Sequence, residues 1–149
     1  MRLIAFLLTV IPSMLLNAQA TRFFEPSKLI ETGVYYYPEA WDKTQWERDF
    51  AKMAEMGFEF THFAEFAWAK LEPTEGVYDF TWLDEAVNLA AKYKLKVIMC
   101  TPTACPPAWL VTKYPEVMLV TNTGERGEHG SRMHYSWSST KYRELCSAL

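Results

Sequence analysis

The sequence lacks the features that mark several protein classes. It has no run of like charges, and its formal net charge of -3 argues against a nucleic acid as partner. It has no low-complexity segment, no interdomain linker, and neither the CxxC nor the HxxxH spacing of common metal sites. The sequence therefore predicts a single domain with no metal and no cofactor. Half of its residues are hydrophobic and 15% are aromatic, which is ample for a folded core.

Cysteine is scarce, with three residues at Cys100, Cys105 and Cys146. An odd number leaves at least one thiol unpaired. Cys100 and Cys105 are close enough in the sequence to form a disulfide, but a bridge also requires a suitable geometry. We expect three free, mostly buried thiols.

Residues 1–20 have the pattern of a secretory signal peptide. Arg2 precedes an apolar run over residues 3–16, and Ala18-Gln19-Ala20 is a small-x-small cleavage signal. The run is too short for a comfortable membrane span, so we expect no membrane partner. The pattern predicts cleavage after Ala20 and export to the periplasm or the medium. A core helix at the N-terminus is the alternative.

Residues 96–110 are the stretch around which the rest of the chain is arranged. Residues 97–100 are apolar, which predicts a strand buried on both faces of a parallel sheet. Pro102 cannot continue a strand ladder, while Pro106 and Pro107 favour the start of a helix. The loop between them lies at the carboxyl end of a strand, where α/β folds bind ligands. An ordinary proline-stiffened loop is the alternative.

Two similar strand–loop–helix units precede this stretch. Strands are predicted over residues 33–37 and 58–64. Asp42 is expected to cap the first helix and Gly57 to end it, and Thr81 with Asp84 has the spacing of a capping box for the second. The buried faces of the two helices are predicted to carry Trp46, Phe50, Met53 and Ala54, and Leu83, Val87, Ala90 and Ala91. Alternating strands and helices predict a parallel α/β sheet.

Beyond residue 110 the pattern is less regular. Residues 117–121 and 122–124 predict an extended arm and a turn, followed by a polar loop over residues 126–135. Ser138 or Ser139 is expected to cap a last helix that buries Tyr142, Leu145, Cys146 and Leu149. A closed (β/α)8 barrel typically needs about 250 residues. The chain is therefore expected to be a small open α/β domain or, as the unfinished last helix favours, the front half of a barrel.

Six ordered motifs resemble one family. They are Gly33-Val-Tyr-Tyr-Tyr-Pro-Glu39 with Trp41, Ala64-Glu-Phe-Ala-Trp68, Leu71-Glu-Pro73, Thr101-Pro-Thr-Ala104 with Pro106-Pro-Ala-Trp-Leu110, Tyr114-Pro-Glu116, and Gly130-Ser-Arg-Met-His-Tyr135. This order resembles the N-terminal part of family 42 glycoside hydrolases, the bacterial β-galactosidases. The resemblance implies that residues 21–149 are the N-terminal portion of a TIM (β/α)8 barrel. It also implies a retaining mechanism on terminal β-galactosides and a family that is often oligomeric.

The same resemblance assigns site residues. Arg132 matches the substrate-binding arginine, and Glu65 and His134 are expected to line the same face. The acid/base glutamate of the family follows an asparagine, but the sequence contains no Asn-Glu pair. The nucleophile of the family comes from a later strand, so no catalytic residue is expected in this chain and it is predicted to be inactive alone.

Two positions depart from the family. Some members hold a structural zinc with four cysteines, and the first of these positions is Ser136 here, so that site is not expected. The family often has an arginine at the position of His62, which we interpret as a core histidine.

Two other functions remain open at this point. A non-catalytic carbohydrate-binding fragment would use Trp41, Trp68 and Trp109 as stacking platforms, and an inactive truncated product would have no function. Apart from the resemblance, Glu65 could equally be a surface carboxylate.

Overall fold

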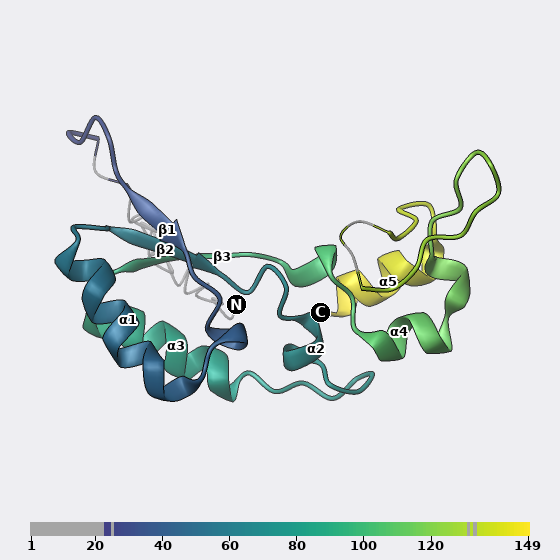
Figure 1. The fold of residues 1–149 in the computed structure, drawn as a ribbon, viewed down its shortest axis with the longest axis horizontal. Coiled ribbons are helices and arrows are strands. Elements are labelled where there is room, and N and C mark those ends of the chain that lie inside the picture. The colour runs from purple at the N-terminus through teal and green to yellow at the C-terminus, as the bar shows by residue number, and fades with distance from the viewer. Residues whose placement is uncertain (1–22, 25, 131, 133) are drawn as a thin grey trace, which may run out of the picture.

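A computed structural model of the chain describes residues 23–24, 26–130, 132 and 134–149. The predicted signal peptide lies outside these residues. Three parallel strands, β1 (Gly33–Tyr35), β2 (Phe60–Phe63) and β3 (Lys96–Met99), form a sheet in the order β1-β2-β3 (Figure 1). Tyr35 pairs with His62, and His62 pairs with Ile98. Each strand lies next to the one that follows it in the sequence, so the predicted parallel α/β arrangement is confirmed.

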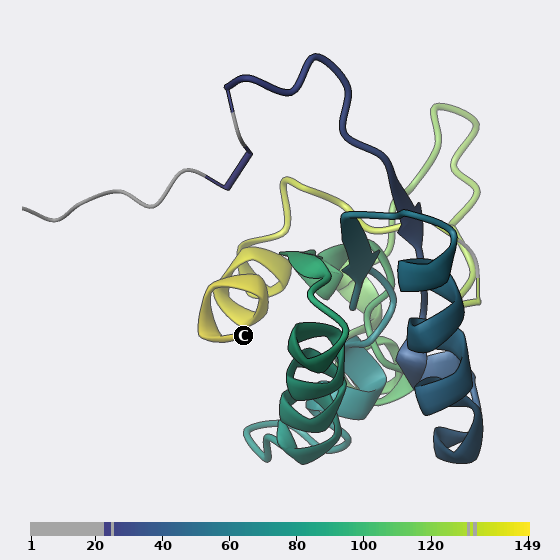
Figure 2. The same ribbon diagram turned by 90° about the vertical axis from the view of Figure 1, so that its left-hand side faces the viewer.

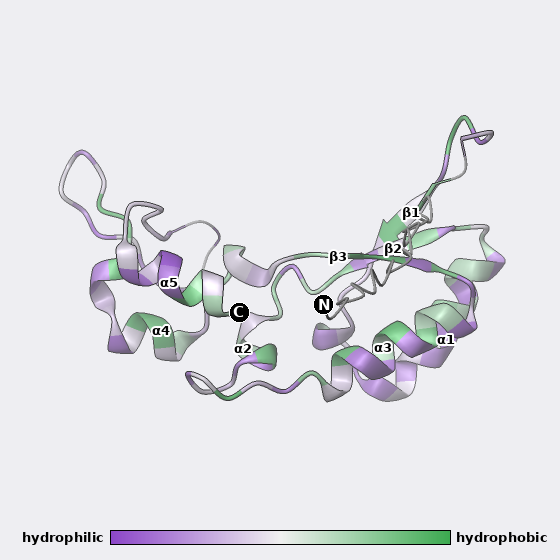
Figure 3. Cartoon of the chain, turned by 180° about the vertical axis from the view of Figure 1, so that it is seen from behind, coloured by the Kyte–Doolittle hydropathy of each residue, from purple (hydrophilic) through white to green (hydrophobic). Residues whose placement is uncertain are grey.

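Helices α1 (Lys43–Glu55) and α3 (Thr81–Lys92) cover the same face of this sheet (Figures 1 and 2). Their hydrophobic sides turn toward the strands and their polar sides turn away (Figure 3). Trp46, Phe50 and Met53 are buried as predicted, and the Phe50 ring meets that of Phe63 on β2 at 6.3 Å between centroids. On α3, Ala90 is buried as predicted, but Leu83 and Val87 are only half-buried and Ala91 is exposed. The other buried residues of this helix are Trp82 and Ala86.

The ends of these helices test the capping predictions. The Asp42 carboxylate accepts a hydrogen bond from the Thr44 N–H at 2.9 Å, so the predicted cap is confirmed. Gly57 follows α1 with a φ of +82°, as expected for a residue that ends a helix. The capping box at Thr81 was wrong. Thr81 is already the first residue of α3, and its N–H is satisfied by the Asp79 carboxylate at 2.9 Å, which leaves no role for a cap at Thr81 itself.

The prediction that the third strand is buried on both faces was also wrong. Lys96, Val97 and Ile98 are only half-buried and Met99 is 46% exposed. The physical reason is the strand order, because β2 is the middle strand and β3 pairs with β2 alone among the described residues. The apolar residues of β3 are typical of a more buried strand than the one seen among the described residues.

A second apolar cluster lies beyond the carboxyl end of β3. It joins α2 (Trp68–Leu71), α4 (Ala108–Lys113) and α5 (Thr140–Ala148) with a short 3-10 helix at Pro115–Val117 (Figure 1). Another 3-10 helix, Pro102–Ala104, is linked to the cluster by the Tyr142 hydroxyl, which donates to the Thr103 carbonyl. The buried members of the cluster are Trp68, Leu110, Val117, Met118, Tyr135, Tyr142 and Leu145. Ser139 caps α5 by accepting the Tyr142 N–H at 3.2 Å, as predicted. Within the described residues, no helix is long and apolar enough to cross a membrane.

The arm between α4 and α5 folds back on itself. Isolated antiparallel bridges join Met118 to Tyr135 and Val120 to Arg126. The turn between them contains Gly124 with a φ of +85°. This confirms the predicted extended arm and turn, and it brings the segment that carries Arg132 back toward the sheet.

Candidate functional site

The functional site is expected on the sheet face that α1 and α3 leave uncovered. Successive side chains of a strand point to opposite faces. On β2, Thr61 and Phe63 are fully buried, with Phe63 against α1, so His62 points to the other face. Its partners in register are Tyr35, whose ring lies 4.3 Å from the imidazole between centroids, and Ile98 on β3. The side chain of Cys100, just after β3, also contacts the imidazole.

The lower part of this face is closely packed. The Phe60 ring lies over Gly33, where an added Cβ would stand only 2.3 Å from a ring carbon. Any larger residue at position 33 would therefore displace the Phe60 ring. A hollow of about 260 Å3 lies on this face of the sheet, and its lining residues are Gly33, Val34, Tyr35, Phe60, His62 and Ile98.

Glu65 is the centre of a polar cluster at the carboxyl end of β2. One of its carboxylate oxygens accepts the Tyr37 hydroxyl at 3.1 Å, and the other forms an ion pair with the Arg132 guanidinium. Burial and the bond to Glu65 raise the pKa of Tyr37. The structure thus brings together two residues that the sequence places 67 positions apart.

Phe66 gives Arg132 a second contact. The guanidinium carbon lies 4.9 Å from the centre of the Phe66 ring. The centre of the Tyr37 ring lies 5.4 Å from the centre of the same Phe66 ring. The arginine side chain is still 62% exposed. Because a guanidinium carries five N–H donors in a rigid fork, the arrangement leaves donors of Arg132 available to a ligand that is rich in hydroxyl groups.

The backbone that carries Glu65 is unusual. Ala64 is fully buried and has a φ of +73°, a backbone conformation that residues other than glycine rarely adopt. Backbone strain of this kind concentrates at functional sites, where the surrounding structure enforces it. The turn is closed by the Ala67 N–H, which donates to the Ala64 carbonyl at 3.2 Å. The turn therefore fixes the direction in which Glu65 leaves the strand.

Cys100 and His62 form a second contact on the same face. The Cys100 Sγ lies 3.0 Å from His62 Nε2, and burial together with the nearby Glu65 charge raises the pKa of the thiol. His62 Nδ1 is buried without a hydrogen-bond partner. His62 as a whole is half-buried and lies on the sheet face that the helices leave open. It is therefore not the fully buried core histidine that the sequence analysis expected. All three cysteines are free, as expected, but each is half-buried, so the expectation of mostly buried thiols was wrong.

His134 is positioned by the arm. Its carbonyl accepts the Leu119 N–H at 2.7 Å, and its side chain lies against Gly127, where an added Cβ would stand 3.2 Å from the His134 Cβ. These contacts do not join His134 to the Glu65–Arg132 pair. Its role as a site residue stays a prediction.

Glu39 is the other carboxylate near this end of the sheet, in the 3-10 helix Pro38–Ala40. Both of its oxygens are buried without a hydrogen-bond partner, and burial raises the pKa of the carboxyl, although Lys70 and the Phe66 backbone act in the opposite direction. Glu39 is therefore closed off from any ligand on the open face.

The three tryptophans expected of a carbohydrate-binding module are mostly committed to structure. Trp68 is fully buried, and its indole N–H donates to the Glu72 carboxylate at 2.7 Å. Trp109 is half-buried, and its indole N–H donates to the Glu72 carbonyl at 2.9 Å. Only Trp41, 52% exposed, remains free to stack on a sugar. The arrangement argues against a module that binds through these three rings.

Sequence reasoning missed Tyr37 and the partnership of Cys100 with His62. The first had a signal, because Tyr35 and Tyr37 alternate within the strand predicted over residues 33–37 and the family motif contains both. The second had none, since the two residues lie on different strands and meet only through the register of β2 and β3.

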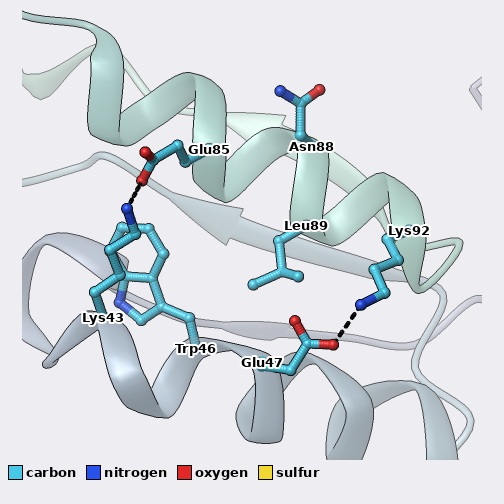
Figure 4. A pocket seen from close by; sticks show the side chains of 7 residues that line it. All are labelled: Lys43, Trp46, Glu47, Glu85, Asn88, Leu89 and Lys92. Atoms are coloured by element: carbon cyan, nitrogen blue, oxygen red, sulfur yellow. Dashed lines mark hydrogen bonds and ion pairs between the residues drawn. The ribbon is translucent and has the colours of Figure 1, made fainter.

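A larger hollow, about 440 Å3, lies on the opposite side of the sheet between α1 and α3 (Figure 4). Two ion pairs cross it, Lys43 with Glu85 and Lys92 with Glu47. Leu89 and Trp46 lie between these ion pairs. All of its lining residues belong to α1 and α3 and none to the segments that directly follow the strands, so we do not assign the ligand site to it.

Comparison with known proteins identifies the family of the chain. The family model of glycoside hydrolase family 42, described as β-galactosidase, matches residues 35–149. The chain is 48% identical over 112 residues to β-galactosidase Bga of Halorubrum lacusprofundi, which covers 75% of the chain and 16% of that protein. It is 50% identical over 112 residues to β-galactosidase BgaA of Thermus sp., covering 75% of the chain and 17% of the relative. The chain thus spans about one sixth of the length of these curated relatives.

Solved structures lead to the same result for the fold. The β-galactosidase of Halorubrum lacusprofundi superposes with a TM-score of 0.77 at 45% identity, over 80% of the chain and 18% of that structure. The β-galactosidase of Marinomonas ef1 gives a TM-score of 0.76 at 40% identity over the same shares. The predicted α/β fold, the N-terminal portion of a TIM barrel, is confirmed. With the matched model covering most of its length, the chain belongs to glycoside hydrolase family 42, the β-galactosidase family.

Proposed function

We propose that this chain forms the first wall of the galactoside-binding site of a retaining β-galactosidase. The observation that carries the proposal is the Glu65–Arg132 pair at the carboxyl end of β2, the end at which TIM-barrel enzymes bind their substrates. In this proposal Arg132 donates to sugar hydroxyls. Glu65 holds the guanidinium in place, and Tyr37 holds Glu65.

The chain is proposed to bind but not to cleave. Retaining hydrolysis needs two carboxyl groups about 5–5.5 Å apart, one as nucleophile and one as acid and then base. The carboxyl groups near this end are Glu39 and Glu65. Glu39 is closed off from the open face, and both oxygens of Glu65 are engaged. Neither residue is free to attack a sugar carbon or to protonate a leaving group.

The test compares two proteins on an aryl β-galactoside. The 149-residue chain is expected to give no turnover. A barrel chimera, in which residues 33–149 replace the matching segment of the Thermus BgaA protein, is expected to hydrolyse the substrate. Turnover by the short chain that disappears on Glu65→Gln would refute the proposal and make Glu65 catalytic. A folded but inactive chimera would also count against it.

Export is part of the proposal and rests on the signal-peptide pattern of residues 1–20. N-terminal sequencing of the exported protein is expected to start at Thr21. An exported protein that starts at Met1 would contradict this.

The uncovered sheet face has a consequence for the chain in isolation. On this face Tyr35 is 64% exposed, on the opposite face Met99 is 46% exposed, and the outer edge of β3 has no partner strand among the described residues. Open edges and apolar faces promote association. We expect light scattering to show oligomers of the isolated chain. A monomer that melts cooperatively would instead support the self-sufficient open α/β domain.

A further inference from the structure

Three residues hold the Arg132 guanidinium, and their contacts form a closed circuit. Glu65 accepts from the guanidinium and from the Tyr37 hydroxyl, the latter at 3.1 Å. The guanidinium carbon lies 4.9 Å from the centre of the Phe66 ring, which in turn lies 5.4 Å from the centre of the Tyr37 ring. Tyr37 is thus linked to Arg132 by two routes, one through Glu65 and one through Phe66. We refer to Tyr37, Glu65 and Phe66 as the support cluster.

The backbone places the support cluster on the sheet. The N–H of Tyr36, directly before Tyr37, donates to a carbonyl of β2 at 3.0 Å. Glu65 and Phe66 are neighbours in the turn after β2, which a hydrogen bond of 3.2 Å closes. The carboxylate and the ring therefore meet the guanidinium together, whereas Arg132 itself comes from the arm.

The exposure of Arg132 makes this support necessary. Its side chain is 62% exposed, and a long side chain of this kind has much rotamer freedom to lose. An ion pair so open to solvent holds it only weakly. An aromatic face adds a second contact that restrains the guanidinium in another direction. Donors that are already restrained bind a ligand at a lower entropic cost.

Tyr37 restrains the carboxylate in the same way. Burial and the bond to Glu65 raise the pKa of Tyr37, so its hydroxyl keeps the proton and acts as the donor. The hydroxyl contacts one oxygen of Glu65, and Arg132 contacts the other. The carboxylate is thus held from two sides.

We propose that Phe66 and Tyr37 are positioning residues for Arg132. Phe66 acts directly through the face of its ring, and Tyr37 acts through both Glu65 and Phe66. Neither is assigned a contact with the substrate. Their effect on catalysis rests on the proposed function, in which Arg132 contacts the sugar, whereas their effect on Arg132 itself does not.

The first test measures the arginine directly. The whole 149-residue chain is treated with phenylglyoxal, and mass spectrometry gives the rate of modification at Arg132 relative to exposed Arg143 on α5. Contacts that cover and hold a guanidinium slow this reaction. Phe66→Leu and Tyr37→Phe should each raise the relative rate at least about two-fold, while Phe66→Tyr retains a ring and should keep the parent rate. An unchanged rate in Phe66→Leu or in Tyr37→Phe would overturn the proposal for that residue.

Two matched variants control for the loss of a ring and of a hydroxyl. Phe80 is 44% exposed and stacks on Tyr78, whose hydroxyl donates to a backbone carbonyl at 3.2 Å. Phe80→Leu and Tyr78→Phe should leave the relative rate at Arg132 unchanged, and acceleration in either would refute the assignment.

Arg126 reports unfolding, because its guanidinium donates to a backbone carbonyl at 2.7 Å in the folded arm. If Phe66→Leu accelerates modification at both Arg126 and Arg132, that variant has lost its fold. Tyr37→Phe, which removes a single oxygen atom, then decides the proposal.

The second test is a double-mutant cycle in the barrel chimera. Phe66→Leu should lower kcat/KM about two- to five-fold when Arg132 is present. In the Arg132→Ala background the same change should alter kcat/KM by a factor of about 1, that is, not at all. An equal loss in both backgrounds would show a merely structural role and overturn the proposal. If Arg132→Ala alone leaves kcat/KM unchanged, the proposed function fails, and the phenylglyoxal rates still decide whether Tyr37 and Phe66 position Arg132.

Discussion

Removal of Arg132 should separate stability from catalysis. The Arg132 side chain is 62% exposed, and ion pairs this exposed to solvent contribute at most about 1 kcal/mol to stability. Its contact with the Phe66 ring at 4.9 Å adds about 0.5–1 kcal/mol at an exposed site. In the barrel chimera, Arg132→Ala should therefore lower the free energy of unfolding by no more than about 1–2 kcal/mol.

Arg132→Ala should also lower the catalytic efficiency of the chimera. A guanidinium that donates to a sugar hydroxyl forms a charge-assisted hydrogen bond, which is stronger than a bond between neutral groups. Its loss should lower kcat/KM at least about ten-fold, which corresponds to about 1.4 kcal/mol of transition-state stabilisation. Steady-state kinetics on an aryl β-galactoside measure this, and urea unfolding of the same preparation measures stability.

Lys113→Ala is the matched control. Lys113 forms an ion pair with Glu75, its side chain is 58% exposed, and its ammonium also lies over an aromatic ring, that of Tyr114, at 5.3 Å. It differs from Arg132 in lying away from the candidate site. The two variants should have similar unfolding free energies, and only Arg132→Ala should be impaired in catalysis. Equal kcat/KM for Arg132→Ala and the parent chimera would remove Arg132 from the site.

Three further predictions concern the stability of the same chimera. Lys94 and Ala64 both have positive φ, at +59° and +73°, so glycine relieves about 1–2 kcal/mol of strain at each but costs about 0.5–1 kcal/mol in entropy. Ala64→Gly also loses a buried methyl group, so Lys94→Gly should be the more stable variant by about 1 kcal/mol in urea unfolding, and the opposite order would contradict the strain argument. The raised pKa of Glu39 means that the folded state holds its proton more tightly than the unfolded state, so stability falls as pH rises from the usual value of 4.5. Glu39→Gln should therefore be more stable than the parent at pH 7 but not at pH 3–4, and a pH-independent difference would argue against burial as the cause. Trp68→Phe removes the 2.7 Å bond to buried Glu72 and should cost about 1.5–3 kcal/mol, so a change below about 0.5 kcal/mol would show that another group holds this carboxylate.

The sequence by itself determined the local features of the fold and the family. The cap at Asp42, the helix end at Gly57 and the cap at Ser139 were predicted because the groups involved are only a few residues apart. The parallel α/β order followed from the alternation of strand and helix patterns. Arg132 and Glu65 were singled out as site residues because ordered motifs mark them, without any knowledge of their contact.

The tertiary structure alone decided which of these residues meet and how deeply each is buried. The partnership of Glu65 with Arg132 and Tyr37, and that of Cys100 with His62, depend on strand register and on the fold of the arm, which act over tens of residues. The wrong prediction of a capping box at Thr81 shows that the sequence can mislead at short range as well. The Thr81 N–H donates to the Asp79 carboxylate, a partner that the capping-box spacing does not indicate. The exposed Met99 shows it for burial, since an apolar sequence favours a dry environment but only neighbouring strands and helices can provide one.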